Sequence, residues 1–136
     1  MPTANAEAIW NGSLKEGSGK MKLGTGAFEG AYTFASRFEN GKGTNPEELL
    51  GAAHAGCFTM AVSAALGQAG FTPTSLDTVA TISMENLTVT GSHLEIKGKV
   101  PGISKDQFEE IVKGAEQNCV ISRALSVQIT STATLL

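Results

Sequence analysis

The sequence is poor in cysteine and in charge, and each shortage restricts what the protein can be. Its two cysteines, Cys57 and Cys119, stand 62 positions apart, and a permanent disulfide between them is not expected in a reducing compartment. They are therefore free thiols, a redox pair, or unrelated. Charged residues make up 17% of the chain, which is low for a surface that faces water everywhere, so we expect part of that surface to be an interface.

Positive charge is scarce as well, and it is not clustered. Ten basic against thirteen acidic residues leave a net charge of -3, and no window concentrates Lys or Arg as nucleic-acid or anionic-membrane binding requires. We therefore expect no nucleic-acid partner and no membrane partner. The segment 1–7 has neither the positive start nor the apolar run of a signal peptide, which predicts a cytoplasmic protein.

The most apolar stretch, 49–66, approaches the length of a membrane-spanning helix. It is built largely from Ala and Gly and contains His54, Thr59 and Ser63, which lower its preference for lipid, so a buried helix is the better interpretation. A chain of 136 residues with 41% hydrophobic residues has enough apolar material for one core. We expect a single domain, residues 1–136.

The first half of the chain predicts a small antiparallel meander followed by a long helix. Three short alternating segments lie at 7–10, 20–23 and 31–34. Asn45, Pro46 and Glu48 then mark a helix start as N-cap, first residue and third residue. The helix is expected to run to Ala69 and to close at Gly70, which adopts the left-handed conformation at low cost. Because this helix is apolar or small on nearly every side, it should be enclosed on most faces.

The second half predicts more strands and a second helix. Alternating segments lie at 81–85, 92–100 and 127–135. The first two are expected to pair and to turn near Gly91. Ser104 and Gln107 mark the start of an amphipathic helix that ends near Asn118, and a short segment at 122–125 precedes the last strand. Strands, a buried helix, more strands, an amphipathic helix and a closing strand make an α+β fold.

The two cysteines occupy different kinds of position. Cys57 lies inside the apolar helix, where a free cysteine is commonly an inert core residue. Cys119 lies where the second helix ends and a thiol can move. One cysteine on a rigid helix and one at a helix end are the parts of an attacking and a resolving thiol, although spacing alone does not establish that they meet.

Peroxide reduction requires the attacking sulfur as a thiolate. The pKa of a free thiol is about 8.5, so a nearby cation is needed to lower it. Arg37 is the candidate, because its planar fork can hold a thiolate with one edge while a carboxylate such as Glu47 holds the other. The alternatives are an exposed Arg37 in a loop and a Glu47 that, like Glu48, is simply favoured at a helix N-terminus.

His54 precedes Cys57 by three residues and shares its helical face. This spacing indicates either a Cys–His nucleophilic pair or two metal ligands. A metal site needs further ligands, and the other histidine, His93, lies in a strand pattern, so we expect no metal. Three phenylalanines are candidates for an apolar wall against an organic substrate: Phe38, Phe58 and Phe71.

Several stretches resemble the OsmC/Ohr family, and above all its osmotically inducible OsmC branch. They are RFE at 37–39, GTNPEEL at 43–49, AAHAGCF at 52–58, GFTPTSLD at 70–77 and VPGI at 100–103. The resemblance covers most of the chain. It implies an OsmC-like fold with antiparallel sheets around a long buried central helix, in an intertwined homodimer with active sites at the subunit interface.

The resemblance also implies an activity, that of an organic hydroperoxide reductase that uses no metal or cofactor and is recycled by a dithiol. By motif, Cys57 matches the peroxidatic cysteine and Cys119 the resolving one, while Arg37 and Glu47 match the charged pair that activates the thiol. Val120 follows Cys119 where the family usually has proline, which affects the local backbone and the ease of disulfide formation.

Two other functions remain open at the level of sequence. One is a non-catalytic, ligand-binding, stress-associated dimer in which Cys57 and Cys119 are core residues. The other is acyl transfer by Cys57 and His54. Turnover of a peroxide separates the three possibilities.

Overall fold

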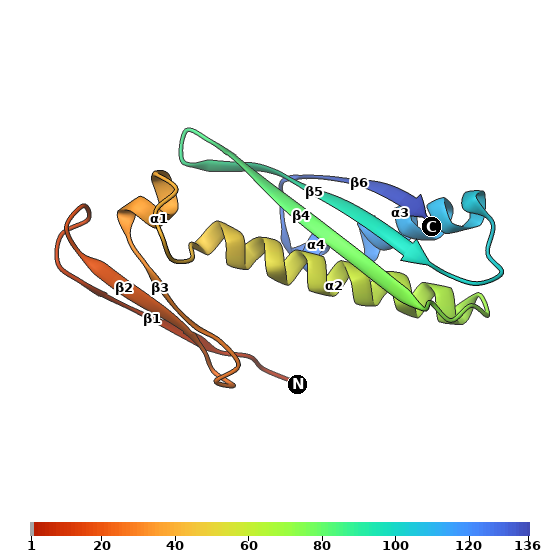
Figure 1. Cartoon of the computed structure of the whole chain (residues 1–136), viewed down its shortest axis with the longest axis horizontal. Helices are drawn as coiled ribbons and strands as arrows, with labels where there is room; N and C mark the ends of the chain where they lie inside the picture. Colours follow the sequence, from red (N-terminus) through yellow and green to blue (C-terminus); the bar gives the residue numbers. More distant parts are fainter. Residues whose placement is uncertain (1) are drawn as a thin grey trace. The chain divides into compact units, whose positions relative to one another are not determined.

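The computed structural model describes residues 2–136 and divides the chain into two compact units, Met1–Leu49 and Leu50–Leu136. We call them the N-terminal unit and the C-terminal unit and describe each by itself. The single domain expected from the sequence remains a prediction. Figure 1 shows the order of the elements along the chain.

The N-terminal unit contains the predicted meander. Its antiparallel strands are β1 (Ala6–Asn11), β2 (Ser18–Leu23) and β3 (Glu29–Tyr32), paired in that order. The rings of Trp10 and Tyr32 pack with centroids 5.3 Å apart across Gly19. A Cβ at Gly19 would lie 2.7 Å from Trp10 and 2.8 Å from Tyr32, so only glycine fits between the two rings.

The third strand ends earlier than predicted, because a short helix missing from the sequence interpretation follows it. In this helix, α1 (Phe34–Phe38), Thr33 is the N-cap: its hydroxyl accepts from the Ser36 N–H, and the Ser36 hydroxyl accepts from the Thr33 N–H. This reciprocal capping turns the chain at Thr33 and places Arg37 in the last turn of a helix rather than in a loop.

The predicted long helix is confirmed as α2 (Pro46–Gln68), and it is continuous. The side chain of Asn45 accepts a hydrogen bond from the Glu48 N–H at 2.7 Å, as expected of an N-cap. Gly70 has φ +90°, the left-handed conformation predicted for the residue that closes the helix.

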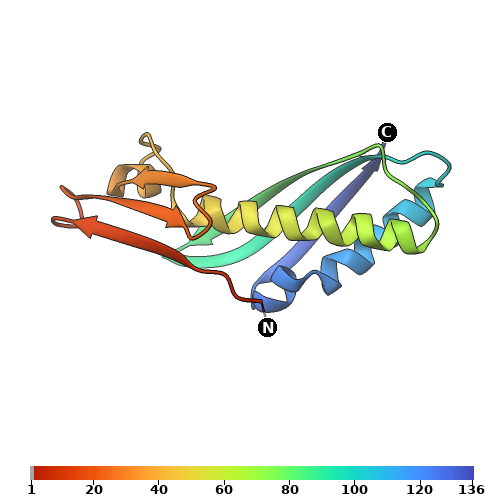
Figure 2. The same ribbon diagram turned by 90° about the horizontal axis from the view of Figure 1, so that it is seen from below.

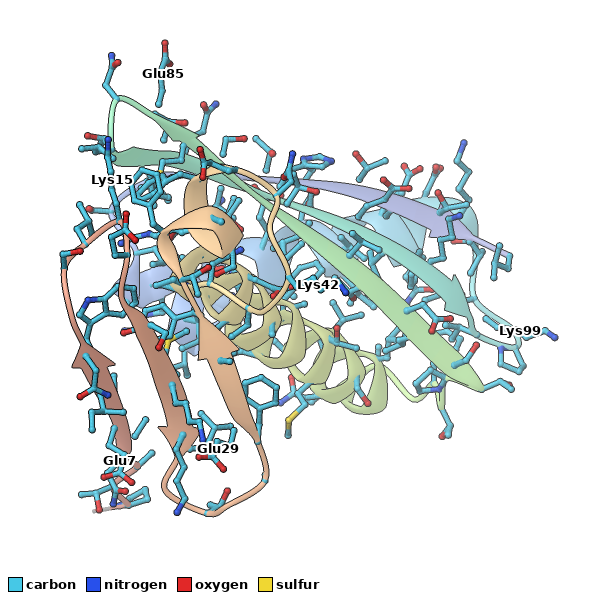
Figure 3. The ribbon with its side chains drawn as sticks, turned by 60° about the vertical axis from the view of Figure 1, so that its left-hand side comes forward. Glu7, Lys15, Glu29, Lys42, Glu85 and Lys99 are labelled. Carbon is cyan, nitrogen blue, oxygen red and sulfur yellow. The ribbon has the colours of Figure 1, made fainter. Side chains whose placement is uncertain are left out.

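The C-terminal unit is built on one three-stranded sheet of β4 (Ser75–Glu85), β5 (Thr88–Lys99) and β6 (Gln128–Leu135). β4 and β5 form an antiparallel hairpin, and Figure 3 shows Glu85 at its tip and Lys99 at its other end. The turn lies at Asn86 and Leu87, so the prediction of a turn near Gly91 was wrong. Gly91 lies within β5 and pairs with Ser83 at a register irregularity of the hairpin.

The last strand differs from the prediction of antiparallel sheets, because β6 runs parallel to β5. A parallel neighbour requires a crossover connection, and α3 (Lys105–Asn118) provides it, followed by the short helix α4 (Val120–Ala124). Ser104 caps α3 by accepting from the Gln107 N–H at 3.1 Å, as its sequence predicts.

The core of the C-terminal unit lies between the sheet and two helices. Figure 2 shows α2 and α3 side by side along the same face of the sheet. The buried apolar side chains come from α2, β5, α3 and the segments that follow β5 and α3: Phe58, Val62, Leu66, Leu94, Ile96, Val100, Phe108, Val112, Ala115 and Cys119. The alternation read from β5 is therefore confirmed, with Ser92, Leu94 and Ile96 on the inner face.

α2 is less enclosed in this single chain than its composition predicts. One stripe of it is buried, made of Gly51, His54, Phe58, Val62 and Leu66. Apolar residues elsewhere on it remain exposed, with Met60 76% exposed. By length and composition α2 could cross a membrane, but the core helix of a soluble protein passes the same test, and its buried stripe packs in this core.

Candidate active site

The two cysteines meet inside the C-terminal unit. Cys57 is half-buried on α2, and Cys119 is buried between the end of α3 and the start of α4. Both are free thiols, and they lie close enough for each to affect the pKa of the other through a hydrogen bond. Contact between the thiols, which spacing alone could not establish, is therefore a property of the fold.

The chain bends at Cys119 because its backbone leaves the helical conformation there. Its φ of -57° and ψ of 134° end α3, and its N–H still bonds to the Ala115 carbonyl. The Arg123 N–H then bonds to the Cys119 carbonyl and starts α4. The predicted position of Cys119 at a helix end is confirmed, and the bend turns the N–H groups at the start of α4 toward the sulfurs.

The surroundings shift the pKa values of the two thiols in opposite directions. Burial raises the pKa of Cys57, hydrogen bonding with Cys119 raises it further, and the backbone N–H groups of Ile121 and Val120 oppose the rise. The pKa of Cys119 is lowered. Burial alone would raise it, but hydrogen bonding from Cys57, from the Ser122 N–H and hydroxyl and from the Ile121 N–H prevails. Within this unit, negative charge is therefore favoured on Cys119.

Val120 contributes to this arrangement through its backbone. Its N–H is one of the groups that stabilise a negative Cys57 sulfur. A proline at this position, as the family usually has, carries no N–H and could not do so. The departure from the family pattern thus adds a donor at the thiol pair.

Arg37 and Glu47 form an ion pair in the N-terminal unit. The Arg37 Nε lies 2.9 Å from Glu47 Oε1, and the guanidinium lies 5.2 Å from the centre of the Phe38 ring. The Asn45 side chain bonds to the Ser36 carbonyl at 3.1 Å and ties α1 to the start of α2, which brings the two charges together. This bond uses one of the five N–H donors of Arg37, so others can hold a second anion.

His54 does not pair with Cys57, although both lie on α2. It is fully buried, its Nδ1 lies 2.6 Å from Ser92 Oγ, and its Nε2 lies 2.7 Å from Ser122 Oγ. Burial lowers the pKa of His54, which favours the neutral ring. This arrangement gives no support to a Cys57–His54 pair for acyl transfer.

No group of three or more His, Cys, Asp and Glu side chains that could hold a metal ion occurs within residues 2–136. The proposed wall of phenylalanines is also not assembled as predicted. Phe58 is fully buried in the core and cannot face a substrate, and Phe71 packs against that core. Phe38 instead lines a hollow of about 240 Å³ in the N-terminal unit, together with other aromatic residues and Arg37: Trp10, Tyr32 and Phe34.

The sequence interpretation missed two residues of the site, Ser92 and Ser122. Ser92 stands on the inner face of β5, in line with Leu94 and Ile96, where an apolar residue is the normal choice. His54 likewise stands in the buried stripe of α2. Polar residues at positions that alternation or helical periodicity assigns to the core need partners, and this signal was available in the sequence.

The fold belongs to a known class. An OsmC-like protein from Mycoplasma pneumoniae superimposes with a TM-score of 0.78 at 16% identity, covering 99% of this chain and 98% of its own. The organic hydroperoxide resistance protein OhrB of Bacillus subtilis superimposes with a TM-score of 0.71 at 18% identity, covering 97% and 98%. The α+β architecture is therefore that of the OsmC/Ohr proteins.

Sequence comparison identifies the family itself. Residues 39–133 match the family model for OsmC-like protein, and the chain belongs to this family. It is 44% identical to Peroxiredoxin OsmC of Escherichia coli (strain K12) over 129 residues, covering 91% of this chain and 90% of that protein. It is 32% identical over 102 residues to the organic hydroperoxide resistance protein of Xanthomonas axonopodis pv. citri (strain 306), covering 70% and 68%. These names support a peroxidase activity in general.

Proposed function

We propose that this protein is a thiol-dependent peroxidase that reduces organic hydroperoxides to alcohols through a Cys57 sulfenic acid and a Cys57–Cys119 disulfide. The observation that carries the proposal is the meeting of two free thiols that stand 62 positions apart in the sequence. An attacking and a resolving thiol must approach each other to condense, whereas two unrelated core cysteines have no need to do so.

In the proposed cycle the Cys57 thiolate attacks one peroxide oxygen and the O–O bond breaks. The departing alkoxide takes up a proton and leaves as the alcohol, and Cys57 becomes a sulfenic acid. The Cys119 thiolate then attacks the Cys57 sulfur and forms the disulfide, and the released hydroxide takes up a proton to become water. An external dithiol reduces the disulfide and restores both thiols.

The first step requires a positive partner for Cys57, because its pKa is raised within the C-terminal unit. We assign this role to Arg37, held by Glu47. α2 is continuous, and ten residues of helix rise about 15 Å from Glu47 to Cys57, too far for the two to share a site within one helix. We therefore assign the ion pair of one chain to Cys57 of a second chain in a homodimer.

The choice of an organic substrate is supported by the aromatic hollow that includes Arg37. A hydroperoxide with an alkyl or aryl group can bury that group against Trp10, Tyr32 and Phe38, whereas hydrogen peroxide has no apolar part to bury. We place the reaction in the cytoplasm, where the reducing pool supplies electrons and keeps resting thiols free.

The test is consumption of cumene hydroperoxide, tert-butyl hydroperoxide and hydrogen peroxide by the reduced protein, with dithiothreitol, reduced glutathione or no reductant. We expect the two organic peroxides to be consumed faster than hydrogen peroxide, and turnover to continue with the dithiol. The same measurement on protein with both cysteines changed to serine is the control. Failure to consume any peroxide under every reductant contradicts the proposal and favours a non-catalytic binding dimer.

A further inference from the structure

A chain of buried polar groups leads to the resolving thiol. It begins at Ser92 on β5, passes through His54 on α2 and reaches Ser122 on α4, with separations of 2.6 Å and 2.7 Å at the two ring nitrogens of His54. All three side chains are at most 7% exposed. Ser122 stands in the first turn of α4, directly beside Cys119, whose carbonyl starts that turn.

The number of hydrogens available allows two directions for these hydrogen bonds, one for each tautomer of His54. A neutral imidazole carries one N–H, and each serine has one hydroxyl hydrogen. If Ser122 donates its hydrogen to Cys119, its oxygen must accept from the His54 Nε2–H, and His54 Nδ1 must then accept from Ser92. In this case every donor points the same way, from Ser92 through His54 and Ser122 to Cys119, and each bond strengthens the next.

The opposite direction of the hydrogen bonds makes the Cys119 thiolate less stable. With the hydrogen on Nδ1, His54 Nε2 accepts from Ser122, and the serine hydrogen points away from Cys119. The Cys119 sulfur then loses a donor and its thiolate is less stable. The tautomer of His54 thus decides how readily Cys119 ionises, and the Ser92 hydroxyl can bond to Nδ1 in either tautomer because it both donates and accepts.

We propose that His54 is a positioning residue which, with its hydrogen on Nε2, turns the Ser122 hydroxyl toward Cys119 and so holds the resolving thiol as the thiolate that attacks the Cys57 sulfenic acid. This inference rests on the proposed peroxidase function. Cys119 loses its proton before the attack, its electron pair forms the S–S bond, and the hydroxyl group of the sulfenic acid leaves with a proton as water. The Ser122 hydroxyl and N–H are among the groups that lower the pKa of Cys119.

The other titratable groups near Ser92, His54 and Ser122 bond to other partners or are exposed. Cys57 of α2 contacts Cys119 and is part of the pair. On α3, Glu116 bonds to Ser131 and to Lys113. On β5, His93 bonds to Thr130 and Thr132 on the opposite face from Ser92. On α4, Arg123 is exposed.

The proposal is tested first by the titration of Cys119 as the single thiol, in Cys57→Ser protein, followed by the ultraviolet absorbance of the thiolate. Ser122→Ala and His54→Leu should raise the pKa of Cys119 by about one unit, which leaves about tenfold less thiolate at neutral pH. His54→Gln retains a donor near the position of Nε2 and should keep most of the lower pKa. Thr59→Val is the matched control, because it removes a hydroxyl of α2 that pairs with Thr78.

The second readout is the decay of the sulfenic acid in protein with both cysteines, trapped at intervals after one equivalent of cumene hydroperoxide. In Ser122→Ala the decay should be about tenfold slower at neutral pH and should approach the wild-type rate at a pH above both pKa values. A purely structural role of Ser122 would slow the decay equally at every pH, and this outcome overturns the proposal.

The third readout is the position of the hydrogen on the His54 ring, measured in the wild-type protein. The protein has two histidines, so a spectrum of ¹⁵N-labelled imidazoles contains two rings, and His54→Gln assigns them. Hydrogen on Nε2 of His54 in the reduced protein is expected, and hydrogen on Nδ1 refutes the proposed direction. The titration and the spectrum use no peroxide. If the peroxidase assay fails while Ser122→Ala and His54→Leu raise the pKa of Cys119 as expected, the proposed function is rejected and the role of His54 stands.

Discussion

Cys57 and Cys119 differ in what surrounds each sulfur, and this difference separates their proposed roles. Cys57 is fixed on a long helix and half-buried, so it can meet a substrate. Cys119 is 1% exposed and cannot be reached by a peroxide without movement, but it lies at a bend where α3 ends. Access therefore supports our proposal that Cys57 attacks first, although charge is favoured on Cys119 within the unit.

We predict that Cys57→Ser abolishes peroxide consumption, because only the attacking sulfur is needed to cleave the O–O bond. Cys119→Ser should permit roughly one turnover per subunit and leave a sulfenic acid that a dimedone probe captures. The measurement is peroxide consumed per subunit together with the mass of the trapped protein. Equal residual activity in the two variants would reject the assignment.

Arg37 presents a planar fork, and that shape is the basis of a second prediction. Arg37→Lys keeps the charge but cannot bind Glu47 and a thiolate through separate edges, so the oxidation of Cys57 should slow by about tenfold or more. The measurement is the rate of sulfenic acid formation and the pH at which Cys57 ionises. Arg123→Lys, at an exposed position on α4, is the matched control and should leave both unchanged.

His54 leads to a prediction about stability and pH. Burial lowers the pKa of His54 in the folded protein, whereas the pKa of a histidine in the unfolded chain is about 6.5. As the pH falls below that value, His54 becomes protonated in the unfolded chain but stays neutral in the folded protein, so the free energy of unfolding decreases. The advantage of wild type over His54→Gln should shrink between about pH 7.5 and 5.5.

Urea denaturation at each pH measures this effect. The comparison is made in a Cys57→Ser, Cys119→Ser background, so that ionisation of the thiols does not contribute. A constant difference in the free energy of unfolding across this range would mean that folding does not lower the pKa of His54.

The turn at the tip of the β4–β5 hairpin carries a local conformational cost in its backbone. Its two-residue turn places Asn86 at φ +52° and Leu87 at φ +61°. Hairpins of this kind prefer Asn followed by Gly, because a side chain at the second position is crowded in the left-handed conformation. Leu87 is also 81% exposed, so it gains little by packing.

We therefore predict that Leu87→Gly raises the free energy of unfolding by up to about 1 kcal/mol. The loss of backbone freedom that glycine brings reduces this gain but does not reverse its sign. Denaturant unfolding of the two proteins measures it, with Thr88→Gly in the adjoining strand as the control that should destabilise. A destabilised Leu87→Gly would show that Leu87 is held by contacts beyond the turn.

The elements themselves were largely predictable, because their signals are local. Asn45 and Ser104 cap their helices and Gly70 closes one, each as expected. The turn at Asn86 and Leu87 was not predicted, because a leucine carries no turn signal, and α1 was missed because a helix of five residues shows no periodicity. The parallel pairing of β6 depends on where α3 carries the chain, which no local pattern records.

At the scale of the molecule, the exposed apolar side of α2 supports our proposal of a homodimer. In one chain a single stripe of the helix is buried, while Met60 and the small residues around it face outward. A second copy of the helix could cover this side. The candidate site also depends on contacts that the sequence does not record. The spacing of Cys57 and Cys119 did not show that they meet, and the group that activates Cys57 is our proposal.

We predict an obligate homodimer with composite sites. Glu47→Ala and Cys57→Ser subunits, unfolded together and refolded, should recover activity, because one site of each heterodimer pairs an intact Cys57 with the intact Glu47 of the other chain. Random pairing makes about half the dimers heterodimers with one working site in two, so about a quarter of wild-type activity is expected. Each variant refolded alone is the control.

Sedimentation of the wild-type protein accompanies this experiment. A fully active monomer would contradict the composite site. Inactive mixtures of two properly folded variants would do the same and would require Arg37 and Glu47 to act within their own chain.

In the cycle we propose, the contact between Cys57 and Cys119 also couples catalysis to the stability of the fold. A bond between residues 62 positions apart closes a long chain loop, and the lost entropy of the unfolded chain is worth about 4 kcal/mol. By the thermodynamic cycle, the folded pair is harder to reduce than the same pair in the unfolded chain by the same free energy, roughly 90 mV. If the proposed disulfide forms, the oxidised protein is the more stable form, and the dithiol that reduces it must overcome this added stability.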